Sequence, residues 1–167
     1  MLPDYKTKRL FLRKLSDEDT HFIFELVNTP GWIKFIGDRN VKTIEDAGQY
    51  IQKILNNPNV EYLVVTLQDE DTSIGVISFI KRDYLEHYDI GFAFLPAYAG
   101  QGYAFEAANN VLADQLKKHA TILATTLTDN HSSIRLLKKL GFVFTREIIN
   151  AEDKLQLYII NSEKNIS

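Results

Sequence analysis

Apolar residues recur along the chain with two spacings, one typical of strands and one typical of helices. Short runs rich in apolar and β-branched residues predict strands at 9–15, 61–67, 73–80, 87–95, 121–127, 142–149 and 155–160. Apolar positions three or four residues apart predict helices at 17–28, 43–55, 103–118 and 130–140. Because strands outnumber the helices that could connect them, we expect a mixed α/β (α+β) sheet of about six to seven strands flanked by about four helices.

Two stretches are expected to interrupt or end the regular structure. Pro30 and Gly31 are expected to end the first helix, and residues 31–42 are expected to be irregular. The tail from Ser162 to Ser167 is expected to be loose. No linker, repeat or low-complexity tract divides the rest, so the 167 residues predict a single domain over 1–167.

Composition excludes several kinds of chemistry. The chain has no cysteine, which excludes disulfides, thiolate metal sites and a cysteine nucleophile. Its net charge of −3 gives no overall basic field for nucleic acid. No apolar run approaches the ~20 residues of a membrane span, and residues 1–9 lack the apolar stretch of a secretory signal. We therefore expect a cytoplasmic protein with neither a nucleic-acid nor a membrane partner.

The segment from Gly91 to Ala104, GFAFLPAYAGQGYA, joins a predicted strand to a predicted helix through a glycine-bearing loop. Gly100 and Gly102 allow backbone conformations that other residues avoid, and they allow close approach to a ligand. Free amides at the start of the helix could bind phosphate. The loop lacks the lysine of a P-loop and does not fit the G-x-G-x-x-G pattern. On these grounds alone, a plain tight turn stays open.

A second segment, DNHSSIRLLKKLGF, covers residues 129–142 and begins the last predicted helix. Asn130 and Ser133 are three residues apart, so they share one face at the N-terminal end of that helix. The simplest interpretation is local: Asn130 caps the helix, Ser133 supports the cap, and the leucines pack in the core.

Taken together, these two segments resemble the acetyl-CoA-binding core of the GNAT N-acetyltransferases. The opening TKRLFLR, residues 7–13, resembles the first strand of the branch that contains the ribosomal-protein N-terminal acetyltransferases. The resemblance covers nearly the whole chain. It implies the GNAT fold, with the sheet splayed at the strand before the glycine loop, and it implies acetyl-CoA as co-substrate with no metal.

The resemblance also implies roles for individual residues. The main-chain amides expected to hold the pyrophosphate belong to Ala99, Gly100, Gln101, Gly102, Tyr103 and Ala104. The backbone expected to pair with the pantetheine arm and the thioester belongs to Phe92, Ala93, Phe94 and Leu95. The Asn130 side chain is expected to bond the pantetheine arm.

Two positions depart from the family pattern. Ala99 stands where the loop often has Arg or Gln, which is tolerable if backbone amides do most of the binding. Leu137 stands where many members have the tyrosine that protonates the leaving thiolate. Some members of the ribosomal-type branch use a serine in this helix, so Ser133 is the candidate acid, or else only a cofactor contact.

Direct attack by an amine requires that the amine be neutral, and the candidate bases lie around the predicted splayed strand. They are Asp83, Glu86, His87 and Asp89. Asp89 is preferred because strand alternation places it on the same face as Gly91 and Ala93. A solvated position or a salt bridge is the alternative for Asp89, and a water relay to a backbone carbonyl would need no named residue.

Trp32 and Arg39 are the candidates for binding the acceptor, because this family commonly builds its acceptor site in the loop before the second helix. Packing in the core is the favoured alternative for Trp32. Lys138 and Lys139 could lie near the CoA phosphates or form a solvated helix face. His21, His119 and His131 have no ligand spacing, so no metal is assigned.

The sequence therefore predicts an acetyl-CoA-dependent N-acetyltransferase. Its expected partners are acetyl-CoA and a primary amine, either a protein N-terminus or a small amine, and a monomer or homodimer is expected. A non-catalytic acyl-CoA-binding sensor or scaffold is the alternative, and a plain nucleotide-binding domain is a third interpretation.

Overall fold

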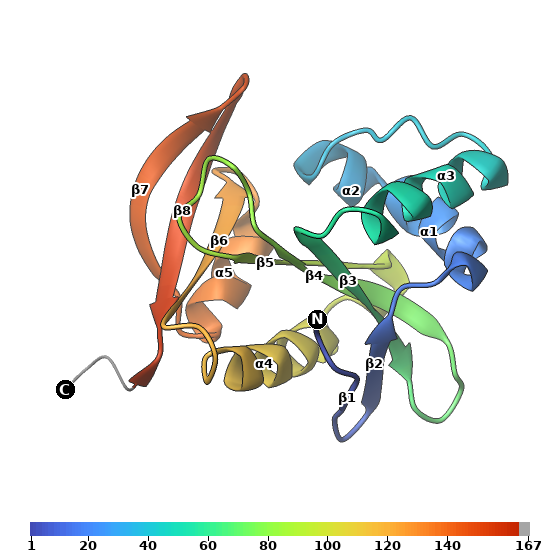
Figure 1. The fold of residues 1–167 in the computed structure, drawn as a ribbon, viewed down its shortest axis with the longest axis horizontal. Coiled ribbons are helices and arrows are strands. Elements are labelled where there is room, and N and C mark those ends of the chain that lie inside the picture. The colour runs from blue at the N-terminus through green and yellow to red at the C-terminus, as the bar shows by residue number, and fades with distance from the viewer. Residues whose placement is uncertain (164–167) are drawn as a thin grey trace.

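The computed structural model describes residues 1–163, which form one eight-stranded sheet with helices on both faces (Figure 1). The strands are β1 (Tyr5–Lys6), β2 (Leu10–Lys14), β3 (Val60–Leu67), β4 (Ser73–Ile80), β5 (Asp89–Phe94), β6 (Thr121–Leu127), β7 (Val143–Asn150) and β8 (Asp153–Asn161). The α-helices are α1 (Thr20–Val27), α2 (Pro30–Phe35), α3 (Ile44–Leu55), α4 (Tyr103–Gln115) and α5 (His131–Lys139). Short 3-10 turns occupy Asp17–Asp19 and Pro96–Tyr98.

The sheet is mixed, as the sequence predicts, and its spatial order is β1-β2-β3-β4-β5-β6-β8-β7. Every pair of neighbours is antiparallel except β5 and β6, which are parallel and are connected through α4. That connection is the crossover a parallel pair requires. The strands predicted at 73–80 and 121–127 agree residue for residue with β4 and β6.

Two apolar clusters cover the two faces of the sheet. One joins α4 and α5 to the sheet and contains Ile77, Ile90 and Ala107. The other joins α1, α2 and α3 to the opposite face and contains Ile23, Ile51 and Val76. Since Val76 and Ile77 are neighbours on β4, strand alternation alone sends them to different clusters. We call the face covered by α1, α2 and α3 the α1–α3 face, and the face covered by α4 and α5 the α4 face.

The prediction of an irregular stretch from residue 31 is wrong at its start. Pro30 begins α2 instead of only ending α1, because a proline at the first helical position has no hydrogen bond to lose. The Thr29 side chain caps this helix by accepting from the Trp32 amide. With β1, this short helix explains why the described chain has one more strand and one more α-helix than the upper counts predicted.

The prediction of a loose tail is wrong for Ser162. Its amide donates to the Ala120 carbonyl over 2.8 Å, and the residue is buried, so the end of β8 is held to the residue that precedes β6. Residues 164–167 lie outside the part of the chain that the structure describes.

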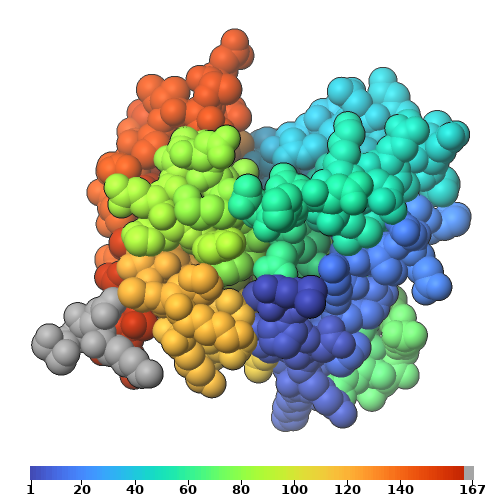
Figure 2. Space-filling view, viewed as in Figure 1, coloured from blue at the N-terminus to red at the C-terminus, as the bar shows by residue number. Residues whose placement is uncertain are grey.

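The connection between β4 and β5, residues 81–88, packs on the half of the sheet that contains β6 and β8. Leu85 from this connection is buried against Leu123 of β6 and Leu157 of β8. The Lys81 ammonium holds the turn by donating to the carbonyl of Leu85 over 2.5 Å. In Figure 2 this connection belongs to the lime-green patch between the orange strands and the teal α3 region. It therefore joins the two halves of the sheet where β5 and β6 begin.

Candidate active site

The parallel strands β5 and β6 pair only at their first residues. Asp89 is the one β5 residue with a partner in β6, Leu123, and the Leu123 amide donates to the Tyr88 carbonyl over 2.9 Å. From Ile90 onward β5 stays paired with β4 but leaves β6. The sheet is therefore splayed at the strand before the glycine loop, as the family resemblance implies.

The antiparallel ladder decides which backbone groups of β5 face this gap. The Leu95 amide donates to β4, at the Ile74 carbonyl, over 2.8 Å. Hydrogen-bonding direction alternates along a strand, so Ala93 also faces β4, whereas Phe92 and Phe94 direct their amides and carbonyls toward the gap. Four residues are predicted to pair with the arm of the co-substrate, and the prediction is wrong for Ala93 and Leu95. The backbone groups of Ala93 and the Leu95 amide serve β4, and the Leu95 carbonyl accepts from the Tyr98 amide.

The glycine loop follows β5 and presents unpaired amides. Gly100 and Gly102 have φ of +73° and +82°, which favour glycine because a Cβ would be strained there. Within residues 1–163, no acceptor lies within hydrogen-bond distance of the amides from Gly100 to Phe105. The Ala99 amide donates to the Pro96 carbonyl over 3.2 Å, so the prediction that Ala99 belongs to this set is wrong. An array of amides at a helix start suits an anion.

Arg9, at the start of β2, fixes this loop in place. Its Nη1 donates to the Gln101 carbonyl over 3.0 Å, and its Nε donates to Glu106 Oε1 over 2.7 Å. The guanidinium also stacks on the Tyr103 ring, 4.3 Å from the ring centre. A hollow of about 480 Å³ lies beside these groups and is lined in part by Gly102.

Sequence reasoning gave no role to Arg9 or to Glu106. The two residues are 97 positions apart, and no local pattern indicates that they meet. The one available signal was an acidic residue in the first turn of the helix that follows the loop. Burial raises the pKa of Glu106, but hydrogen bonds from Thr7 and Arg9 outweigh that effect and leave its pKa below the ordinary value.

The start of α5 contains the two polar residues predicted from the second segment. The Asn130 side chain caps the helix by accepting from the Ser133 amide over 3.3 Å, which is the local interpretation. The side-chain nitrogen of Asn130, Nδ2, donates to no group in residues 1–163. Ser133 is half-buried on the same turn, and Leu137 is buried in the core. The predicted roles of Asn130 and Ser133 toward a ligand stay predictions.

Asp89 lies where β5 and β6 still pair, which we call the closed end of the gap, and it forms an ion pair there. The Arg82 Nε lies 2.6 Å from Asp89 Oδ2, and the Asp89 side chain is only 3% exposed. Burial raises the pKa of Asp89, while the Arg82 guanidinium acts in the opposite direction. The role of Asp89 as a general base stays a prediction, and this placement favours the alternative of a salt bridge.

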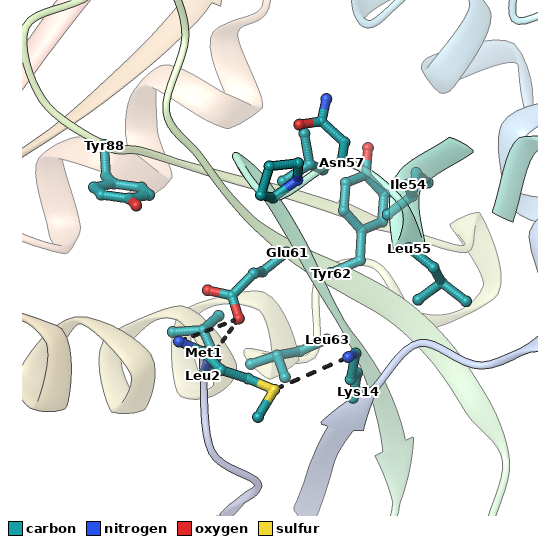
Figure 3. Close-up of a pocket in the computed structure, with 12 residues that line it drawn as sticks. Met1, Leu2, Lys14, Ile54, Leu55, Asn57, Glu61, Tyr62, Leu63 and Tyr88 are labelled. Carbon is teal, nitrogen blue, oxygen red and sulfur yellow. Dashed lines mark hydrogen bonds and ion pairs between the residues drawn. The ribbon is translucent and has the colours of Figure 1, made fainter. Parts of the chain in front are cut away.

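The two residues expected to bind the acceptor have different surroundings. Trp32 is buried among the residues of the α1–α3 core, so its placement contradicts a role in lining an open site. Arg39 is exposed and lies near Tyr62. The Tyr62 hydroxyl lies 3.5 Å from that of Tyr50. Tyr62 also lines a hollow of about 240 Å³, where its ring is directed toward Asn57 (Figure 3).

The remaining candidates lie on α5 and on the connection between β4 and β5. The Lys139 ammonium lies 4.3 Å from the centre of the Phe105 ring, beside the hollow at the start of α4. Its role near a phosphate stays a prediction, as does that of Lys138. Asp83, Glu86 and His87 are exposed. Between residues 1 and 163 there is no cluster of three His, Asp or Glu side chains that could hold a metal, and no helix long and apolar enough to cross a membrane.

Comparisons with known proteins agree with this geometry. The family model described as acetyltransferase (GNAT) domain matches residues 9–143. The chain is 36% identical over 137 residues to the uncharacterized N-acetyltransferase YnaD of Bacillus subtilis (strain 168), which covers 81% of this chain and 79% of that protein.

Two solved structures share the fold. Ribosomal-protein-S5-alanine acetyltransferase from Vibrio fischeri superposes with a TM-score of 0.79 at 20% identity, covering 96% of this chain and 97% of that one. Spermidine N-acetyltransferase from Vibrio cholerae, solved with CoA and spermine, gives a TM-score of 0.79 at 19% identity, covering 96% and 100%. With the family match over most of the sequence, the splayed sheet and the glycine loop show that this chain belongs to the GNAT acetyltransferase family and is an N-acetyltransferase.

Proposed function

We propose that this protein transfers the acetyl group of acetyl-CoA directly to a primary amine held in the same complex. The observation that carries the proposal is the separation of β5 from β6 beyond Asp89. It leaves the backbone groups of Phe92 and Phe94 facing a gap that leads to the unpaired amides at the start of α4. An extended, amide-bearing arm that ends in a pyrophosphate fits both features.

Each part of this arrangement has a separate binding task. The amides from Gly100 to Phe105 bind the pyrophosphate, helped by the positive end of the α4 dipole. The edge of β5 pairs with the amides of the pantetheine arm, as an added strand would. Asn130 offers its side-chain nitrogen to the same arm. When bound, acetyl-CoA supplies a thioester carbon that an amine can attack.

Deprotonation of the amine sets what further help the chain must give. At neutral pH a free α-amine costs about 1 to 1.4 kcal/mol to deprotonate, whereas a lysine-like amine costs about 4 to 5 kcal/mol. Asp89 is already paired with Arg82. A water held by a backbone carbonyl at the gap is sufficient to take the proton from an α-amine and pass it to solvent, so a protein N-terminus or a small amine of low pKa needs no further base.

Departure of the thiolate also requires a proton. Leu137 is buried in the core, so it leaves no ionisable group at the family's usual tyrosine position. Ser133 is the nearest alternative on the same helix face, one turn earlier. We assign it the role of hydrogen-bond donor to the leaving sulfur. The absence of cysteine leaves direct attack as the simpler route, because no thiol can carry the acetyl group.

Release of the free CoA thiol tests the proposal. The protein contributes no thiol of its own, so a thiol-reactive dye reports turnover without background from the chain. We expect amine-dependent thiol release, with an N-acetylated product in the mass spectrum. Tight binding of acetyl-CoA with no transfer to a broad panel of amines and peptides would instead support the sensor alternative. The cytoplasmic location and the choice of monomer or homodimer stay predictions.

A further inference from the structure

The Asp89 carboxylate holds the Arg82 guanidinium in place at the closed end of the gap. Asp89 shares its face of β5 with Ala93, which packs against the α1–α3 core, so the ion pair lies on the α1–α3 face. This is the face opposite α4. Because the loop amides at the start of α4 are assigned to the co-substrate, an acceptor approaches the gap from the side where Arg82 lies.

Arg82 keeps hydrogen-bonding capacity that Asp89 does not use. Nε contacts the carboxylate, and the Tyr84 hydroxyl also lies within reach of the guanidinium. An arginine has five N–H donors, so others are left for a ligand. The guanidinium is half-buried, with 36% of the side chain exposed. An arginine held by a buried carboxylate presents its remaining N–H groups in a fixed orientation, and such a fork suits a carboxylate or a phosphate.

The surroundings of this guanidinium are positive or neutral. Burial raises the pKa of Tyr62, and Arg39 and Arg82 both act to lower it, so both guanidinium charges lie near that tyrosine. The Tyr84 ring lies near Arg82 on the same connection, and burial raises its pKa as well. The carboxylates of Asp83 and Glu86 are exposed. The buried carboxylate at this end, Asp89, is already neutralised by Arg82.

The distance from this pair to the reacting centre can be estimated from the strand. Asp89 and Phe92 are three residues apart, which is about 10 Å along a strand. Between them, Ser78 places its hydroxyl beside Gly91, where a Cβ would lie only 2.5 Å from Ser78 Oγ. An approach of about 3 Å between the amine and the thioester, and a hydrogen bond of about 3 Å at the guanidinium, take up part of that span. A spacer of about four bonds therefore separates an amine at Phe92 from an anion at Arg82.

We propose that Arg82, held by Asp89, binds an anionic group on the acceptor, so that the preferred substrates are primary amines that carry a carboxylate or a phosphate about four bonds away. This inference rests on the proposed function and names the substrate class of the same site. It predicts discrimination against diamines, because a second ammonium would face Arg82 and Arg39 without an unpaired buried carboxylate to receive it.

Three amines of equal spacer length test this directly, assayed near pH 10 because such alkyl amines have pKa values of about 10.4 and no further base is assigned to the site. They are 4-aminobutyrate, n-butylamine and 1,4-diaminobutane, which present an anion, a methyl group and a cation at the same distance from the amine. A fourth, 3-aminopropyl phosphate, separates phosphate from carboxylate as the preferred anion. We expect kcat/KM to be at least about tenfold higher for one of the anionic amines than for butylamine, and lowest for the diamine.

The decisive variant removes both charges of the pair. Arg82→Gln alone leaves Asp89 buried and unpaired, which lowers the stability of the folded state. The double variant Arg82→Gln/Asp89→Asn keeps the shapes and leaves no buried charge. We expect the double variant to show a cooperative thermal unfolding transition and a Kd for acetyl-CoA within about twofold of wild type. We expect it to lose the preference for the anionic amine. Arg146→Gln, at an exposed arginine of β7, is the matched control and should keep that preference.

Every outcome decides between the claims. A preference for the anionic amine that disappears in the double variant and persists in Arg146→Gln supports the inference. Equal use of the amines, preference for the diamine, or no transfer to any of them despite binding of acetyl-CoA overturns the inference and leaves the acetyl-CoA site standing. Failure to bind acetyl-CoA overturns the proposed function, and the inference falls with it.

Discussion

Substitution of Arg9 by methionine should weaken acetyl-CoA binding although Arg9 is not assigned a contact with it. The guanidinium bonds Glu106, the Gln101 carbonyl and the Tyr103 ring. Since the Arg9 side chain is 40% exposed, its ionic hydrogen bond is worth about 1 kcal/mol rather than the value of a buried pair. The carbonyl bond adds roughly 0.5 kcal/mol and the ring contact about 0.5 kcal/mol, giving about 2 kcal/mol in total.

These contacts fix the loop whose amides are assigned to the pyrophosphate, so their loss should appear in two measurements. The melting temperature of Arg9→Met should fall by about 4 to 8 °C for a domain of this size. If about 1.4 kcal/mol of that loss is loop order needed for binding, the calorimetric Kd for acetyl-CoA rises about tenfold.

Arg13→Met is the matched control on the same strand. Arg13 bonds both oxygens of Asp19, at 2.9 and 2.7 Å, far from the glycine loop. Asp19 is buried, so this variant leaves an unpaired carboxylate and should lose about 3 kcal/mol of stability or more. Its Kd for acetyl-CoA should stay within about twofold of wild type. An unchanged Kd in Arg9→Met, or an equal rise in both variants, would refute the reasoning.

Three further predictions concern the same region. Gly102→Val places a branched side chain at φ +82°, 3.4 Å from Arg9 Nη2, and should weaken acetyl-CoA binding at least about tenfold by calorimetry; unchanged affinity would remove this loop from the site. Ser133→Ala should lower kcat about tenfold or more with little change in the Kd for acetyl-CoA, whereas a higher Kd with normal kcat would make Ser133 a binding residue. Because the pKa of Glu106 is lowered in the folded state, its contribution to stability is present above its ordinary pKa and is lost as pH falls through the lower folded value. Glu106→Gln should therefore show a shallower loss of stability on acidification in urea titrations, and parallel curves would contradict this.

Much of the fold follows from local patterns. Alternation and capping predict the strands and the longer helices, because their apolar faces repeat with a constant period. Thr43, for example, begins α3 with a capping box closed by Asp46. The two elements that the sequence missed are short. β1 has only two residues, and α2 starts at a proline that also ends helices.

The candidate site could be predicted only in part. The glycines and the strand before them are contiguous, so the loop and the splay follow from the sequence and the family resemblance. The ladder direction that commits Ala93 and Leu95 to β4 depends on pairing with a strand about 20 residues away, which no single segment contains. The fastening of the loop by Arg9 and the pairing of Arg82 with Asp89 are likewise tertiary contacts, and charged residues in a sequence do not indicate their partners.

Calorimetric titration of the folded protein with acetyl-CoA, with ADP as the comparison ligand, tests the central claim most directly. The backbone of Phe92 and Phe94 is assigned to the pantetheine arm, and the loop amides are assigned to the pyrophosphate. We therefore predict micromolar binding of acetyl-CoA and binding of ADP at least about tenfold weaker, because ADP can use the loop but not the edge of β5. Equal affinity for the two ligands would mean that the gap beside β5 binds nothing, and no binding of acetyl-CoA would contradict the account as a whole.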